Sequence, residues 1–297
     1  MIDKIIGIIP PMLTPFKQNA AVDYDAFARN IKRWNAFPLA GYLVLGSNSE
    51  AAYLTEEEKL LLIDATVKTA AKGKIIIAGT GLESTRETIR FTNKVAQHGA
   101  HAALVLTPSF YGDKMTDIAL IRHFSAVSDA SDIPILLYNV PKYTHVNLSV
   151  PAVLALSRMR NIIGMKDSKG DCAQLAEFKK AVHEDFHLIV GSASILYPAF
   201  TMGVRAGILA LANCAPAQCI EIQRLHDAGE HQKAEELQKQ MLPVNKAVTD
   251  TFGIAGLKYA STLMGYSGGY VRSPLTELAE TDKFAVTAIL KTAGLLQ

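Results

Sequence analysis

The chain has 297 residues, of which 49% are hydrophobic and 20% charged, and its 30 Lys and Arg against 28 Asp and Glu leave a formal net charge of +2. These values are those of an ordinary globular protein and exclude a disordered or collagen-like chain. The balanced charge, without a basic run, also argues against a nucleic-acid partner.

The N-terminal segment does not have the pattern of a signal peptide. Pro10, Pro11 and Pro15 interrupt its short apolar run, and Asp3 spoils the basic start. No segment of the chain reaches the roughly 18 consecutive apolar residues of a membrane helix. The three cysteines, an odd number without a C-x-x-C pair, make a poor disulfide framework. We therefore expect a cytoplasmic protein with no membrane partner.

Short β-branched apolar runs recur along the chain and predict strands. Each run is almost continuously hydrophobic, as in a parallel sheet that is covered on both faces. Capping boxes that begin at Thr55 and Ser84 introduce two of the amphipathic helices between the runs. The eight runs occupy residues 5–10, 41–46, 74–80, 101–108, 133–141, 162–168, 186–193 and 206–213.

This alternation predicts an α/β fold, a (β/α)8 TIM barrel with an appended C-terminal helical layer. An open doubly wound sheet would normally carry a Gly-x-Gly-x-x-Gly turn after its first strand, and none is present. We expect residues 1–215 to form the barrel core. Residues 216–297 are predicted to supply the last barrel helix and further helices of the same structural unit, because no linker precedes them.

Lys166 is the residue that most strongly indicates catalysis. It ends the sixth predicted strand, and the C-terminal strand ends of such a barrel form the active site. Removal from water disfavours the charged ammonium, which leaves an amine able to attack a carbonyl and form a Schiff base. The alternative is a structural salt bridge to Asp167 or to another carboxylate at a strand end.

Tyr138 ends the neighbouring fifth strand, where its phenol can move protons near the Lys166 amine. The alternative, a rim tyrosine that only packs its ring, is less favoured once the two residues are taken together. Residues 46–50, Gly-Ser-Asn-Ser-Glu, follow the second strand and predict an anion receptor for the carboxylate of a 2-oxo acid. Without Lys166, an ordinary polar turn would be the simpler interpretation. Gly191, Ser192 and Ile208, on the seventh and eighth strands, are expected to bind substrate.

Other motifs favour no different chemistry. The histidine pairs His98/His101 and His183/His187 lack a carboxylate that would complete a metal site, so we expect no metal and no cofactor. Cys172 begins a predicted helix, and nothing else marks it as a nucleophile.

Three motifs together resemble the dihydrodipicolinate synthase / N-acetylneuraminate lyase family of pyruvate-dependent class I aldolases, over essentially the whole chain. The resemblance implies that Lys166 forms the Schiff base and that Tyr138 shuttles protons. It also implies that Ser47 completes the proton relay and binds the pyruvyl carboxylate with Asn48, and that the chain forms a homodimer or homotetramer. The motifs are Gly46-Ser47-Asn48-Ser49-Glu50, Tyr138-Asn139-Val140-Pro141 and Gly164-Met165-Lys166-Asp167.

The sequence departs from the family pattern at three places. Tyr143, a predicted substrate-binding residue, stands where family synthases carry an arginine for the carboxylate of aspartate semialdehyde. A phenol cannot make the bidentate contact of a guanidinium, although the neighbouring Lys142 can partly substitute. The relay tyrosine that many members take from an adjacent subunit aligns with Phe110, one residue before Tyr111. Ser49 replaces the second glycine of Gly-x-x-Gly-Glu and is expected to distort the loop.

Residues 46–50, 164–171, 210–213 and 252–258 are similar to the 4-hydroxy-2-oxoglutarate aldolase branch. We therefore expect a lyase that cleaves a 2-oxo acid to pyruvate and an aldehyde. One alternative is a 4-hydroxy-tetrahydrodipicolinate synthase, which condenses pyruvate with aspartate semialdehyde. Another is an aldolase or dehydratase of 2-oxo-3-deoxy sugar acids. A non-catalytic barrel that binds a 2-oxo acid has no use for a poised amine.

Overall fold

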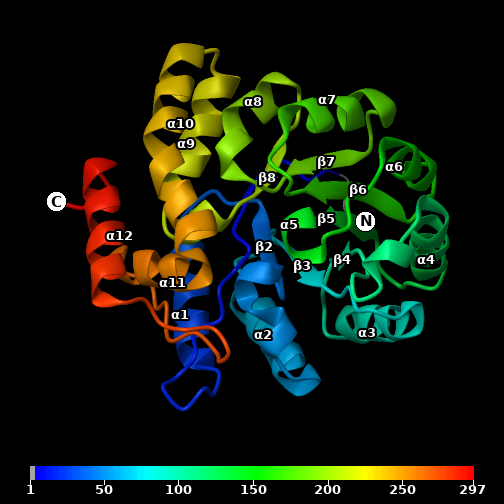
Figure 1. The fold of residues 1–297 in the computed structure, drawn as a ribbon, viewed down its shortest axis with the longest axis horizontal. Helices are drawn as coiled ribbons and strands as arrows, with labels where there is room; N and C mark the ends of the chain where they lie inside the picture. Colours follow the sequence, from blue (N-terminus) through cyan, green and yellow to red (C-terminus); the bar gives the residue numbers. More distant parts are fainter. Residues whose placement is uncertain (1–3) are drawn as a thin grey trace.

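The computed structural model describes residues 4–297 and confirms the (β/α)8 barrel (Figure 1). All eight strands are parallel, and the ladder runs in the order β1-β8-β7-β6-β5-β4-β3-β2. The strands are β1 (Gly7–Ile9), β2 (Gly41–Val44), β3 (Ile75–Gly79), β4 (Ala102–Leu106), β5 (Ile135–Asn139), β6 (Ile162–Asp167), β7 (His187–Val190) and β8 (Ala206–Ile208).

Helices alternate with these strands and surround the barrel (Figure 1). The predicted capping box at Thr55 is present, whereas at Ser84 only the serine half forms, because the Glu87 carboxylate pairs with Arg90. The helices are α1 (Tyr24–Trp34), α2 (Glu56–Thr69), α3 (Thr85–Gln97), α4 (Asp117–Asp129), α5 (Pro141–Thr144), α6 (Val150–Ser157), α7 (Cys172–Ala181), α8 (Leu196–Thr201), α9 (Pro216–Asp227), α10 (His231–Lys246), α11 (Gly253–Leu263) and α12 (Glu280–Thr292).

The segment that follows β1 closes the barrel against β2. Pro11 bridges Leu43 in parallel, the Met12 N–H donates to the Leu43 carbonyl at 2.9 Å, and the Leu43 N–H donates to the Pro10 carbonyl at 3.1 Å. Two apolar layers follow from this closure. Inward-facing side chains fill the barrel, and a larger layer packs between strands and helices. The inner layer includes Ile9, Leu43, Ile77, Leu104, Leu136, Ile189 and Ile208.

Beyond α9, the C-terminal helices α10, α11 and α12 form a layer on one side of the barrel (Figure 1). The segment after α11 is attached to α1, because Arg33 donates to the Gly265 carbonyl at 2.8 Å and Trp34 stacks on Tyr266 with ring centroids 5.3 Å apart. Across residues 4–297, every helix is too short or too polar to span a membrane.

Asn213 follows β8 and binds the segment that follows β1, and its side chain is fully buried. Its Oδ1 accepts the Leu13 N–H at 3.1 Å, and its Nδ2 donates to the carbonyls of Pro11 and Ala210, each at 3.0 Å. The side chain therefore fixes the closing segment relative to the end of β8.

We expect Asn213→Ala to lower the free energy of unfolding by about 1–3 kcal/mol, because the Leu13 N–H and the Pro11 carbonyl would be left buried without partners. Urea denaturation measures the change, with Gln232→Ala on the exposed face of α10 as the control. A loss within about 0.5 kcal/mol of that control, the usual range for surface substitutions, would contradict the assigned role.

Candidate active site

A cavity of about 370 Å³ opens at the C-terminal ends of the barrel strands. Seven of the eight residues predicted to be catalytic or to bind substrate line it, and only Ser47 does not. Three of the seven lie in the strands β5, β6 and β8, two directly follow β7, one lies in the turn after β2 and one lies in the short helix α5. Barrel closure brings them together. They are Asn48, Tyr138, Tyr143, Lys166, Gly191, Ser192 and Ile208.

Lys166 lies on β6 directly beside Tyr138 of β5, since the two residues are register partners in the sheet. Its side chain is buried, and its Nζ lies 4.3 Å from the centroid of the Tyr138 ring. Within the described part of the chain, no carboxylate forms an ion pair with this amine. The alternative of a salt bridge to Asp167 is wrong, because that carboxylate points away and accepts from the Asn139 amide at 2.7 Å.

Asp167 is itself fully buried, and burial raises the pKa of its carboxyl against the opposing effect of the Asn139 hydrogen bond. The Asn139 amide also donates to Asn147 at 2.9 Å, and its carbonyl oxygen accepts the Leu148 N–H at 2.9 Å. This network fixes the ends of β5 and β6 relative to one another. It thereby fixes the separation of Tyr138 and Lys166.

The Tyr138 hydroxyl lies 3.3 Å from Ser47 Oγ, at the other side of the barrel mouth. Burial alone would raise the pKa of Tyr138. The positive charge of Lys166 and the hydrogen bond with Ser47 outweigh it and hold the pKa below its ordinary value. A phenol with a lowered pKa and a hydroxyl partner suits a residue that donates and accepts protons.

Ser47 and Asn48 begin a 3₁₀ turn, Ser47–Ser49, that follows β2. Asn48 lines the cavity with Lys166, whereas Ser47 lines a second cavity of about 460 Å³ beside it. Tyr138 lines both cavities, so the contact between Tyr138 and Ser47 lies in the wall between them. Asn48 therefore faces the cavity of Lys166, and Ser47 faces the Tyr138 hydroxyl.

The expectation that Ser49 distorts this loop is wrong. The left-handed conformation falls on Glu50, with φ 54°, and Ser49 lies within the 3₁₀ turn. Ser49 Oγ donates to the Met12 carbonyl at 2.5 Å, and Thr14 Oγ1 donates to the Ser49 carbonyl at 2.8 Å. A serine at this place therefore ties the loop to the segment that closes the barrel.

Gly191 is a glycine because the end of β6 leaves no room for a side chain. A Cβ at this position would lie 2.8 Å from the Asp167 carbonyl oxygen and 3.0 Å from Lys166 Cε, and it would overlap Ser168 Oγ. Ser168 also lines the cavity, next to Lys166 and Tyr138. Ser168 ends the sixth predicted strand and was not among the predicted site residues.

The outer wall of the cavity comes from the C-terminal layer, which the sequence analysis did not connect to the site. A π-helical turn, Ala247–Thr251, joins α10 to α11 and faces the strand ends. Such turns are frequent at functional sites. Pro243 near the end of α10 and Gly253 after the turn were its only local signals. The lining residues of this wall are Asn245, Val248, Thr249, Asp250, Gly253 and Ile254.

Tyr143 and Lys142 lie at the mouth of the cavity, on the short helix α5. Lys142 Nζ pairs with Asp250 at 2.7 Å and donates to the Thr249 carbonyl at 2.8 Å. Both side chains of the pair are about half exposed. Burial of its ring raises the pKa of the Tyr143 phenol, against the lowering effect of Lys142. The mouth thus carries an ion pair and a neutral phenol.

Phe110 and Tyr111, the two candidates for the relay position of an adjacent subunit, line neither cavity. Their rings pack edge to face, with centroids 5.0 Å apart, and are 78% and 67% exposed. Assembly into a homo-oligomer stays a prediction. Within residues 4–297, no group of three or more His, Cys, Asp or Glu side chains is arranged to hold a metal ion.

A closed (β/α)8 barrel with a buried lysine and a tyrosine at adjacent strand ends defines a class of enzyme, the class I aldolases that work through a lysine Schiff base. The comparison with protein families agrees, because the model of the dihydrodipicolinate synthetase family matches residues 4–293. The chain belongs to this family.

Among curated relatives, 4-hydroxy-tetrahydrodipicolinate synthases from Ruegeria pomeroyi and Agrobacterium fabrum are each 34% identical to this chain. The alignments cover 98% of it and 99% of each relative. A solved dihydrodipicolinate synthase from Acinetobacter baumannii, described as complexed with pyruvate, superposes with a TM-score of 0.93 at 30% identity, over 99% of this chain and all of the other. These relatives carry the synthase name. They do not support the expected placement in the 4-hydroxy-2-oxoglutarate aldolase branch.

The pKa of Tyr138 provides a test of the site without any substrate. Removing the amine by Lys166→Met should raise this pKa, because the positive charge that opposes burial would be lost. The absorbance of tyrosinate, followed against pH in each protein minus its Tyr138→Phe counterpart, reports this residue alone. The tyrosinate signal should appear at lower pH in the native chain than in Lys166→Met, and coincident curves would contradict the coupling.

Proposed function

We propose that the chain condenses pyruvate, held as a Schiff base on Lys166, with an aldehyde, as 4-hydroxy-tetrahydrodipicolinate synthases do with aspartate semialdehyde. The observation that carries the proposal is the buried Lys166 amine beside the Tyr138 phenol in a cavity of about 370 Å³. This volume is in the usual range for small-molecule sites. The names of the relatives support the synthase reaction over cleavage.

The chemistry follows from the positions of the side chains. Neutral Lys166 attacks C2 of pyruvate, and Tyr138, hydrogen-bonded to Ser47, protonates the hydroxyl that leaves as water. The resulting imine loses a C3 proton to Tyr138 and becomes an enamine. Its C3 attacks the aldehyde carbon, and the new alkoxide takes the proton back. With aspartate semialdehyde, the amino group of the product then attacks C2 and releases Lys166.

The ion pair at the mouth supports aspartate semialdehyde as the second substrate. This molecule carries a carboxylate and an ammonium group on one carbon, and Lys142 and Asp250 present the opposite charges 2.7 Å apart. An exposed ion pair of this kind contributes little stability, so a substrate can exchange partners with it. Lys142 would then bind the carboxylate and Asp250 the ammonium, in place of the arginine that the family carries at the position of Tyr143.

Cleavage of 4-hydroxy-2-oxoglutarate to pyruvate and glyoxylate is the second candidate, and Tyr143 favours it. A phenol offers one hydrogen bond and no charge, which suits a small aldehyde acid better than an amino acid. The same imine would then accept the electrons of the breaking C3–C4 bond. This candidate needs Lys142 for the glyoxylate carboxylate but gives Asp250 no partner.

The Schiff base is tested by mass analysis after incubation with pyruvate and borohydride. We expect a reduced pyruvyl adduct that peptide mapping places on Lys166, and none in Lys166→Ala, because only a primary amine forms the imine. Tyr138→Phe should still form the adduct, but much more slowly, because the phenol that moves protons is missing. An adduct on another lysine, or none with the native chain, would contradict the proposal.

The two reactions are separated by the charges at the mouth. With pyruvate and aspartate semialdehyde, Lys142→Met and Asp250→Asn should each lower kcat/KM about tenfold, equivalent to about 1.4 kcal/mol of binding energy. With 4-hydroxy-2-oxoglutarate, only Lys142→Met should do so. Lys114→Met, an exposed lysine away from the cavity, is the control. Turnover of 4-hydroxy-2-oxoglutarate alone, indifferent to Asp250→Asn, would select the second candidate.

A further inference from the structure

Glu50 ends the loop that carries Ser47 and Asn48, and its carboxylate is completely buried. Its Oε1 forms an ion pair with Lys258 Nζ of α11 at 2.5 Å, and its Oε2 accepts the Arg272 N–H at 2.8 Å. Both partners belong to the C-terminal layer, which is more than 200 positions away in sequence. The active-site loop is therefore fastened to a part of the chain that lies outside the barrel.

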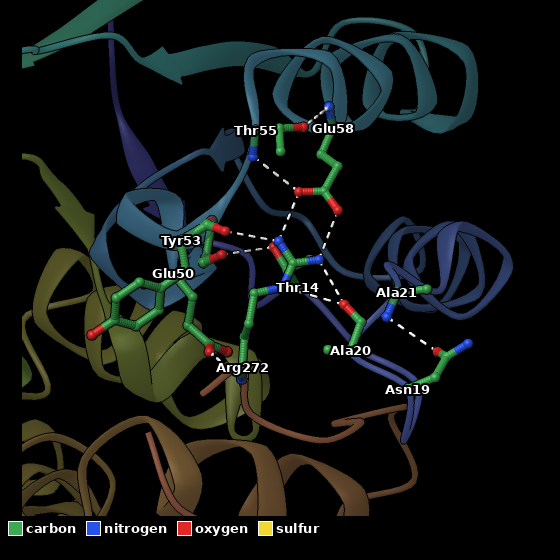
Figure 2. A network of polar contacts seen from close by, with 10 residues as sticks. Thr14, Asn19, Ala20, Ala21, Glu50, Tyr53, Thr55, Glu58 and Arg272 are labelled. Carbon is green, nitrogen blue, oxygen red and sulfur yellow. Dashed lines mark hydrogen bonds and ion pairs between the residues drawn. The ribbon is translucent and has the colours of Figure 1, made fainter. Parts of the chain in front are cut away.

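The side chain of Arg272 also contacts the residues that follow Glu50 in the chain (Figure 2). Its guanidinium binds both carboxylate oxygens of Glu58, each at 2.7 Å, and donates to the Tyr53 carbonyl at 2.8 Å. Glu58 in turn accepts the Thr55 N–H and lies in the first turn of α2. One arginine therefore holds the chain after β2 at Glu50 and Tyr53 and the first turn of α2 at Glu58.

Apart from Glu50, the buried ammonium of Lys258 has few partners. Its side chain is 2% exposed, it donates to the Tyr270 carbonyl, and its Nζ lies 4.5 Å from the centroid of the Phe16 ring. Burial lowers the pKa of its ammonium, and Glu50 opposes that effect. Replacing such a pair by apolar groups is often neutral or stabilising, so the pair is a poor device for stability alone.

The backbone conformation of Glu50 indicates that the ion pair with Lys258 fixes the shape of the loop. Its left-handed conformation, φ 54°, is unfavourable for a residue with a side chain and persists only where the surroundings enforce it. The Glu50 N–H donates to the Ser47 carbonyl at 3.1 Å and closes the turn. Fixing the Glu50 carboxylate therefore fixes the residue whose hydroxyl meets Tyr138.

We propose that Glu50 is a positioning residue for the proton relay, held by Lys258 and Arg272 so that Ser47 stays against the Tyr138 hydroxyl. This inference rests on the proposed Schiff-base function of Lys166. The inference gives the C-terminal layer a role in the chemistry, because α11 and the segment after it hold the loop that follows β2.

The test compares Glu50→Gln, Lys258→Met and the double variant. The single variants leave one buried charge without a partner and can fail to fold, whereas the double variant removes both charges with similar side-chain volumes. We expect the double variant to fold and to form the pyruvate–borohydride adduct about 10- to 100-fold more slowly than the native chain, as for other groups that orient a reacting one. Val153→Ala, a buried change in α6 that lowers stability away from the loop, should leave this rate unchanged.

A double-mutant cycle with Ser47→Ala separates positioning from general stability. If Glu50 acts through Ser47, Ser47→Ala slows adduct formation in the native chain but not further in the double variant. Independent, additive losses, or a native rate in the double variant, would overturn the inference.

A second readout keeps the inference separate from the proposed function. Loss of the Ser47 hydrogen bond should raise the pKa of Tyr138, so the tyrosinate absorbance of the double variant should appear at higher pH than in the native chain. If the native chain forms no adduct, the proposed function fails while this titration still tests the positioning. An unchanged titration overturns it.

Discussion

Lys166 is held out of water at the end of β6, and among the described residues it faces the ring of Tyr138 rather than a carboxylate. A cation above an aromatic face is stabilised, and more so in a site shielded from water. The position of Lys166 also determines the acidity of its neighbour, since the positive charge of Lys166 lowers the pKa of the Tyr138 phenol.

Two neighbouring groups preserve that environment. Asp167, the nearest carboxyl in sequence, is turned to Asn139 on the opposite side of the strand, as the alternation of side chains along a strand requires. Gly191 avoids crowding at the same place, since a Cβ there would overlap Ser168 Oγ and would lie 3.0 Å from Lys166 Cε. The sheet geometry therefore turns the nearest carboxyl away from the lysine, and the glycine leaves room beside it.

The barrel and the lysine–tyrosine pair could be predicted from the sequence because both depend on local patterns. Eight apolar runs give eight strands, and the closure of parallel strands brings their ends together wherever they lie in the chain. The roles of Ser47 and Asn48 were less predictable, since neighbouring residues of one turn line different cavities. Ser49 was misjudged because the left-handed residue is Glu50, whose buried carboxylate pairs with Lys258, far away in sequence. The π-helical turn Ala247–Thr251 was missed because it joins the site only through packing against the distant strand ends, which no local pattern indicates.

The site thus divides into two parts with different dependence on the fold. The reactive groups Lys166 and Tyr138 belong to adjacent strands, where the hydrogen-bonded register fixes their positions. The groups proposed to bind the second substrate belong to α5 and to the C-terminal layer, where Lys142 and Asp250 are about half exposed and weakly bound to each other. Substitutions at this rim leave the strands undisturbed, so one lysine–tyrosine pair can serve different aldehydes. Under the proposed function, Tyr143 would change how the aldehyde is recognised without disturbing the lysine–tyrosine pair, because it lies on α5 at the mouth of the cavity and not on the strands.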